Sequence, residues 1–215
     1  MQSETSMTGA DAVEQRRRLR ADPAAPAPAA TGSHRPLPAT LIADLRTDQA
    51  GEAGAVMIYR GILAISRDPG LRHFAQAHLA TEAHHLAQLD ALLNPRQRSR
   101  LLPLWRIAGW LTGALPALIG PRAVYATIEA VETFVDHHYA EQIASIEQLD
   151  PGQQQPALQS LRDLLGNCRS DEIAHRDEAA LLFSRRGNAP SVGLRLWVGL
   201  VGAGSRGAVK ICRRI

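Results

Sequence analysis

The 215-residue chain has little cysteine and few aromatic residues. Its two cysteines, Cys168 and Cys212, are too few for a disulfide framework or a cysteine-rich zinc site, and they indicate a reducing compartment. Aromatic residues make up only 4% of the chain, whereas alanine and leucine are abundant. This composition favours closely packed helices over a β-sandwich.

The chain also lacks long apolar runs, and we expect no secretory signal because its N-terminus has no apolar core segment. Because no stretch of about 18 uncharged apolar residues occurs, we expect no membrane-spanning helix. The acidic residues Glu4, Asp11 and Glu14 argue against a transit peptide. The formal net charge of +3 comes from scattered arginines with few aromatic neighbours, so no nucleic-acid partner is expected.

What the chain does contain is helical periodicity. Residues 1–38 are charged and then Pro/Ala-rich, which predicts a disordered tail before one domain over 39–215. Apolar spacings of three and four residues, with Pro, Gly and Asn breakers, predict four long helices over 39–66, 70–94, 122–149 and 156–185. An apolar, Pro- and Gly-punctuated segment (100–121) and a C-terminal amphipathic helix (191–215) complete an all-α, four-helix-bundle prediction.

A Glu-x-x-His pair occurs in the second predicted helix and again in the fourth. This spacing places both side chains of a pair on one helix face. The first and third helices each place a glutamate among apolar inward positions. Transferring a carboxylate from water into the protein interior costs on the order of several kcal/mol of folding free energy, unless the carboxylate is paired or binds metal. The order of these motifs is that of ferritin-like dimetal proteins, which predicts the metal ligands Glu52, Glu82, His85, Glu132, Glu172 and His175.

The charge and chemistry of this set define the expected metal. Four carboxylates balance two divalent cations, and oxygen and imidazole donors without thiolate suit iron or manganese rather than structural zinc. Aspartates near the motifs either hydrogen-bond a ligating histidine or are ordinary solvated residues: Asp48, Asp171 and Asp177. The remaining histidines are interpreted as surface or packing residues: His73, His78, His84 and His137.

These motifs resemble those of the Coq7 family, the demethoxyubiquinone hydroxylases, over residues 41–215. DQAGEAGA (48–55) is similar to the family's D-x-A-G-E-Y-G-A, with Ala53 in place of the usual tyrosine. The other matching segments are IYRG (58–61), LPLW (102–105), EAVETFVDHHYAEQI (129–143) and DEIAHRD (171–177). The Ala53 difference affects a neighbour of a predicted ligand and leaves the ligand set intact.

The resemblance implies an O₂-dependent monooxygenase with two iron ions. It would hydroxylate a 2-polyprenyl-3-methyl-6-methoxy-1,4-benzoquinol (demethoxyubiquinol) in ubiquinone biosynthesis, with NADH or the quinol as reductant. His138 and Tyr139 match family residues discussed as an electron relay; a hydrogen-bonded pair inside a helix is the equally weighted alternative. A homo-oligomer, other ubiquinone-biosynthesis proteins and a lipid-binding accessory protein are compatible partners.

Because a polyprenyl tail is insoluble in water, we expect the enzyme to bind its substrate at a membrane. Residues 100–121 combine an apolar stretch with Trp105, Trp110 and Arg106, which is typical of an interfacial element. Residues 191–215 suit anionic lipid, although core packing or a subunit interface competes with this interpretation. We expect peripheral attachment to the cytoplasmic side of a bacterial inner membrane. The alternatives are an iron store, a peroxide-reducing enzyme, a tRNA hydroxylase and a non-enzymatic quinone carrier.

Overall fold

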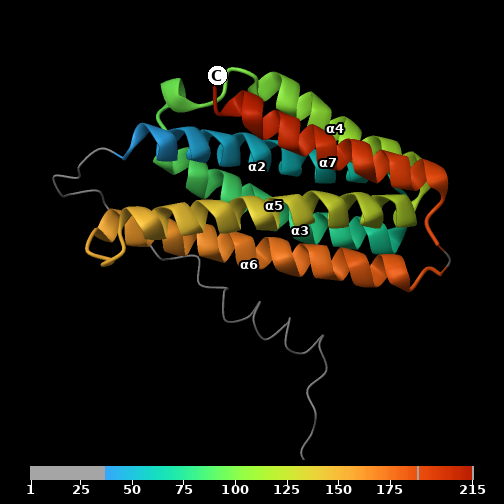
Figure 1. Cartoon of the computed structure of the whole chain (residues 1–215). Coiled ribbons are helices and arrows are strands. Elements are labelled where there is room, and N and C mark those ends of the chain that lie inside the picture. The colour runs from blue at the N-terminus through green and yellow to red at the C-terminus, as the bar shows by residue number, and fades with distance from the viewer. Residues whose placement is uncertain (1–36, 188, 215) are drawn as a thin grey trace, which may run out of the picture. The chain divides into compact units, whose positions relative to one another are not determined.

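Four long helices form the bundle (Figure 1). The computed structural model describes residues 37–187 and 189–214, so the tail predicted over 1–38 lies outside the described residues except for its last two. The bundle helices are α2 (Ala39–Ile65), α3 (Pro69–Leu92), α5 (Pro121–Leu149) and α6 (Pro156–Ser184). The described residues contain no strand. The all-α prediction is confirmed, and each predicted helix end lies within about two residues of the observed one.

Local sequence explains where the helices begin. Asp68 caps α3, because its side chain accepts a hydrogen bond from the backbone N–H of Leu71, and Pro69 follows in the first turn. Gly120 joins α4 to α5 in a tight turn. Its backbone φ angle is 134°, a value that residues with a side chain rarely adopt. Asp150 accepts hydrogen bonds from the backbone N–H groups of Gln154 and Gln155, which fixes the connection from α5 to α6.

The apolar segment predicted to be interrupted is one continuous helix, α4 (Leu102–Ile119), which follows the short 3₁₀ helix η1 (Pro95–Gln97). Pro116 lies in its last turn and does not break it. By length and composition alone, α4 could cross a membrane. This does not test whether it does, so the expectation of no membrane-spanning helix stays a prediction. In the structure α4 lies along α2 (Figure 1), where Gly109 and Gly113 allow close backbone contact.

The C-terminal helix is confirmed as α7 (Val192–Cys212), which lies against α5 and α2 (Figure 1). The indole N–H of Trp197 donates to the Thr127 hydroxyl at 2.9 Å. At the other end of α7, Arg213 forms an ion pair of 2.9 Å with Asp44. These contacts hold α7 on the bundle while several of its apolar side chains remain exposed.

Two hydrophobic clusters fill the bundle. One contains Tyr59, Phe74 and Ile128, and the other contains Leu45 and Leu165, each with further buried residues. Along every bundle helix, the predicted ligands lie in sequence between residues of the first cluster and residues of the second. The polar site is therefore enclosed by apolar side chains at both ends.

Candidate metal centre

The six predicted ligands are buried in the middle of the bundle. One comes from α2, two from α3, one from α5 and two from α6, and none is more than 6% exposed: Glu52, Glu82, His85, Glu132, Glu172 and His175. Each occupies an inward position of its helix, as the periodicity predicts. The structure therefore brings together all six residues that the motifs single out.

These side chains form two overlapping groups of potential ligands. The first contains Glu52 and His85, the second contains Glu132 and His175, and both contain Glu82 and Glu172. Within each group, one ligand atom from every residue lies within 4.8 Å of the others. Two ions held by these groups would share Glu82 and Glu172, and each ion would have one further glutamate and one histidine of its own.

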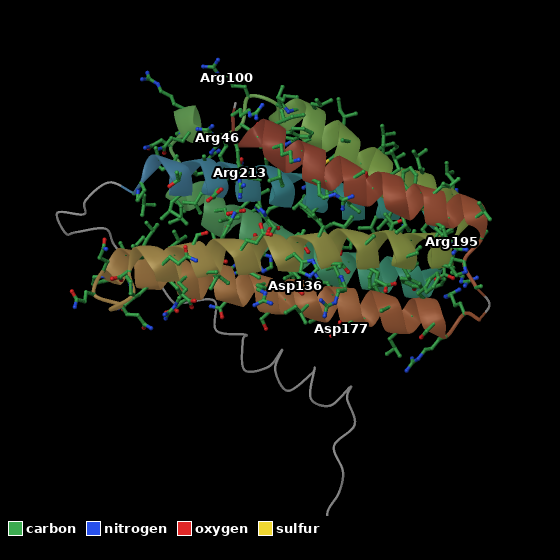
Figure 2. All side chains as sticks on the ribbon, viewed as in Figure 1. Arg46, Arg100, Asp136, Asp177, Arg195 and Arg213 are labelled. Carbon is green, nitrogen blue, oxygen red and sulfur yellow. The ribbon has the colours of Figure 1, made fainter. Side chains whose placement is uncertain are left out.

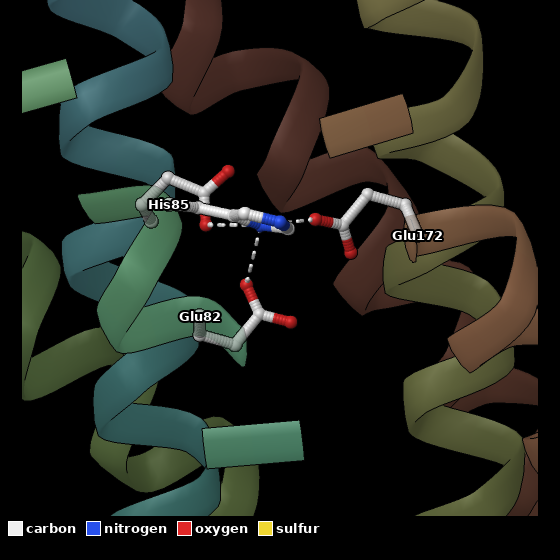
Figure 3. A group of neighbouring side chains, drawn as sticks. Glu82, His85 and Glu172 are labelled. Carbon is white, nitrogen blue, oxygen red and sulfur yellow. Dashed lines mark ion pairs between the residues drawn. The ribbon is translucent and has the colours of Figure 1, made fainter. Parts of the chain in front are cut away.

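Both imidazoles direct Nδ1 toward the carboxylates. His85 Nδ1 lies 3.1 Å from Glu172 Oε1 and 3.9 Å from Glu82 Oε2 (Figure 3). It also lies 3.8 Å from Glu52 Oε2. His175 Nδ1 lies 3.0 Å from Glu82 Oε1 and 3.5 Å from Glu172 Oε2. The spacing of three residues within each pair thus places carboxylate and imidazole on the same centre.

Several of these atoms are buried yet lack an aligned hydrogen-bond partner, although oppositely charged atoms lie within ion-pair distance. They are Glu52 Oε2, Glu82 Oε1, both carboxylate oxygens of Glu172, and Nδ1 of His85 and His175. Buried polar atoms normally have a hydrogen-bond partner, and each one that lacks a partner lowers the stability of the fold. Two cations coordinated by these oxygen and nitrogen atoms would satisfy them together, so the residues fit a dimetal centre.

The electrostatics of the cluster also favour cations. Burial, and then repulsion from Glu172, raises the pKa of Glu52, Glu82 and Glu132 above the ordinary value. Burial acts the same way on Glu172, but the imidazoles of His175 and His85 outweigh it and lower its pKa to about 2. Without metal, the cluster retains protons that a divalent cation would displace.

Tyr139 and Asp171 contact predicted ligands from outside the set. The Tyr139 hydroxyl donates to Glu52 Oε1 at 2.5 Å. Asp171 Oδ2 lies 3.2 Å from His85 Nε2, which is the arrangement that orients a ligating imidazole. Burial would lower the pKa of His85, but Asp171 and Glu172 raise it to about 10. Asp177, the other aspartate beside this motif, pairs with Arg176 on α6 and is exposed (Figure 2).

Asp48 contacts a different histidine from those predicted as ligands. Its Oδ1 accepts a hydrogen bond of 2.7 Å from the Gln142 side chain and lies 3.1 Å from His138 Nε2. Tyr139 follows His138 but contacts the candidate ligand Glu52 instead. His138 and Tyr139 thus belong to two adjacent buried hydrogen-bond groups, and a role for either in electron transfer stays a prediction.

Sequence reasoning missed the polar contacts of His78 and Asp136. His73, His84 and His137 are exposed, whereas His78 is 3% exposed and stacks on His175 with ring centroids 3.9 Å apart. Its place four residues before Glu82, on the same apolar stripe, is the signal that could have found it. Asp136 (Figure 2) accepts hydrogen bonds of 2.7 Å from Arg169 and Arg176, which join α5 to α6.

The all-α bundle belongs to the ferritin-like class, and its two carboxylate–histidine groups have the ligand pattern of the dimetal carboxylate proteins in that class. Within this class, the chain belongs to the family of the ubiquinone biosynthesis protein COQ7, whose model matches residues 39–212. The resemblance drawn from the sequence motifs is therefore confirmed.

Relatives share the sequence over much of the chain. The 3-demethoxyubiquinol 3-hydroxylase of Rhodospirillum rubrum is 38% identical over 188 residues, which are 84% of this chain and 81% of the relative. The mitochondrial 5-demethoxyubiquinone hydroxylase of Saccharomyces cerevisiae is 37% identical over 147 residues, 63% of each chain. The mitochondrial NADPH-dependent 3-demethoxyubiquinone 3-hydroxylase of Homo sapiens is 34% identical over 135 residues, 62% of this chain and 60% of the relative.

Proposed function

We propose that this chain is an O₂-dependent hydroxylase of demethoxyubiquinol in ubiquinone biosynthesis, acting through two iron ions. The observation that carries the proposal is the pair of ligand groups that share Glu82 and Glu172, in a chain of the COQ7 family. The names of the relatives describe hydroxylation of demethoxyubiquinol or demethoxyubiquinone by those proteins. They support the activity but leave the metal and its ligands as part of the proposal.

The ligand set proposed for the iron pair divides into ends and bridges. Glu52 and His85 would hold one ion, Glu132 and His175 the other, and the two shared carboxylates would lie between them. Bound iron supplies the activation of O₂, which protein side chains alone do not provide, and an external reductant supplies electrons. Tyr139 and Asp171 restrict the orientation of Glu52 and His85 through their hydrogen bonds.

The source of electrons is NADH or the quinol itself in this proposal. The name of the human relative describes NADPH dependence for that protein. We propose that His138 and Tyr139 relay electrons from the reductant to the metal centre. Both residues are buried, and Tyr139 hydrogen-bonds the candidate ligand Glu52.

The exposed apolar side chains of α4 and α7 favour a lipid-borne substrate. They include Leu104, Ile107, Leu118 and Ile119 on α4, and Val192, Leu196 and Leu200 on α7. Both helices pack against α2 and α5. Arg100, just before α4, and Arg195, near the start of α7, are labelled at opposite ends of these helices (Figure 2). An apolar surface with flanking arginines suits a membrane interface. We propose peripheral attachment there, on the cytoplasmic side of a bacterial inner membrane.

The attachment is testable with vesicles that contain anionic lipid. Replacing Leu118 and Ile119 together with glutamine should lower the vesicle-bound fraction at least about tenfold, because each side chain loses burial worth about 1.5–3 kcal/mol. Leu149→Gln is the matched control, since Leu149 is 47% exposed at the end of α5. Equal flotation of the double variant and the control would contradict the proposed surface.

The reaction is testable by expressing the chain in cells that lack their own demethoxyubiquinone hydroxylase. Mass spectrometry of extracted quinones should show ubiquinone restored and demethoxyubiquinone depleted. Persistent demethoxyubiquinone with iron-loaded protein would point to iron storage, peroxide reduction or tRNA hydroxylation by the same centre. Persistence without bound iron would point to a non-enzymatic quinone carrier.

A further inference from the structure

His78 lies beside the candidate metal centre without belonging to it. Both of its ring nitrogens have partners outside the predicted ligand set. Nδ1 lies 3.2 Å from the Tyr59 hydroxyl, and Nε2 lies 3.0 Å from Glu178 Oε2. Because a neutral imidazole has one donor and one acceptor nitrogen, His78 can donate on one side while it accepts on the other.

The hydrogen bonds continue from His78 in both directions. On the inner side, the fully buried Tyr59 hydroxyl donates to Glu132 Oε1 at 3.1 Å. On the outer side, the Glu178 side chain is 53% exposed. Each member comes from a different bundle helix: Glu178 from α6, His78 from α3, Tyr59 from α2 and Glu132 from α5. A carboxylate in contact with solvent is thus connected to a candidate metal ligand.

We propose that Glu178, His78, Tyr59 and Glu132 form a path for protons between solvent and the candidate metal centre. The inference rests on the proposed centre and deepens its proposed function. Inserting one atom of O₂ into a ring and reducing the other to water consumes protons together with electrons. Filling the centre with divalent cations releases protons from its ligands. Both processes require protons to cross a water-poor region.

The path carries one proton outward by three linked exchanges. A protonated Glu132 passes its proton to the Tyr59 oxygen, and Tyr59 passes its own proton to His78 Nδ1. His78 releases the proton on Nε2 to the Glu178 carboxylate, which gives it to water. Tyr59 and His78 are neutral before and after the transfer, because His78 only changes tautomer. The reverse order delivers a proton inward.

Two neighbouring hydrogen-bond groups lack this continuity. The contact of Asp171 reaches His85 Nε2, but Nδ1 of that ring faces the carboxylates where an ion would bind, so a proton cannot pass through it. Asp48, bonded to Gln142 and near His138, is itself 4% exposed and provides no half-exposed carboxylate. The path through His78 joins a half-exposed carboxylate to a candidate carboxylate ligand by consecutive hydrogen bonds.

The experiment follows Co²⁺ uptake by the full-length, metal-free protein. Visible absorption reports binding, and an indicator dye in weak buffer reports released protons. Tyr59→Phe and His78→Gln should slow the coupled proton release about 10²-fold, which is the low end for a positioned proton-transfer group. The final Co²⁺ affinity should change far less than the rate. Glu178→Gln should show the same slowing, and Asp163→Asn, another exposed carboxylate of α6, should not.

Chemical rescue separates proton transfer from a structural role. A concentrated buffer base that does not coordinate Co²⁺ should restore the rate of Co²⁺ uptake in Glu178→Gln, followed by visible absorption, because the base can reach His78 from solvent. The same base should leave the buried Tyr59→Phe variant slow. Unchanged rates in all three path variants would overturn the path while leaving the metal centre intact. Affinity losses as large as the rate losses would show a structural role instead. Failure of the parent protein to bind Co²⁺ would overturn the proposed centre and, with it, the path.

Discussion

At the residue scale, Glu82 and Glu172 differ from the other predicted ligands because each belongs to both ligand groups. Both carboxylate oxygens of Glu172 are buried without an aligned hydrogen bond, and the two imidazoles lie within 3.5 Å of it. Loss of a shared carboxylate therefore weakens both ion positions, whereas loss of Glu52 or Glu132 weakens one directly.

The variant Glu172→Ala should hold at most one iron ion per chain and lose hydroxylation, while the helical fold survives. The physical reason is that one oxygen donor is removed from each group at once. Metal analysis of purified protein, together with circular dichroism, checks both parts. Glu129→Ala is the control, because Glu129 lies one turn before Glu132 on α5 and is outside both groups. Full iron content in Glu172→Ala would contradict the assignment.

The sequence predicts the ligand set better than its surroundings. Ligand positions repeat with the helical period, so Glu82 and His85 can be assigned to one inward face without a structure. The contact of His78 with Tyr59 and Glu178 depends on how three helices are rotated against one another, which periodicity does not specify. An aspartate such as Asp136 is expected at the surface from the sequence alone. Its burial is explained by the hydrogen bonds from its two arginine partners on α6, which the sequence does not reveal.

At the element scale, the contact between α2 and α4 depends on glycine. A Cβ added at Gly113 would overlap the backbone carbonyl of Ile58, and one at Gly109 would overlap that of Gly54. Backbone cannot move aside as a flexible side chain can. These glycines were interpreted as interruptions of an apolar segment, because a sequence shows their low helix propensity but not the neighbouring helix that requires them.

Gly113→Ala should destabilise the protein by about 1–3 kcal/mol or more, since the added methyl group forces α4 away from α2. Urea denaturation monitored by circular dichroism measures the change in the free energy of unfolding. The matched control is Gly204→Ala in α7, where an added Cβ meets no atom within 4 Å. That control should be neutral or stabilising by up to about 1 kcal/mol, because alanine favours helix. Equal effects of the two changes would refute close packing at Gly113.

At the scale of the whole molecule, the bundle encloses a cluster of carboxylates between two apolar regions. Its stability should therefore depend on what neutralises the cluster. In metal-free protein the pKa values of Glu82 and Glu132 lie well above the ordinary value, and that of His85 is raised to about 10. Burial is the leading cause for the two glutamates, and neighbouring carboxylates outweigh burial for His85.

The sign of the pH dependence follows from these pKa values. Above about pH 6.5 the unfolded chain is releasing the protons of its histidines, whereas the folded, metal-free chain keeps a proton on His85, whose pKa is raised to about 10. The raised pKa values of Glu82 and Glu132 act in the same direction, because the folded chain holds their protons to a higher pH than the unfolded chain does. The free energy of unfolding should then decrease as the pH rises toward about 9. His78, whose pKa burial lowers to about 4, acts in the opposite direction, but only below about pH 6.5.

Metal should remove this dependence, because bound cations hold the carboxylates ionised at both pH values. Urea denaturation at about pH 7 and pH 9, with and without bound divalent metal, measures the difference. The metal-free protein should be less stable at the higher pH, and the metal-bound protein should change little. His85→Gln should flatten the curve of the metal-free protein between these pH values, since glutamine has no proton to lose there. A metal-free protein equally stable at both pH values would show that the buried carboxylates are ionised without cations.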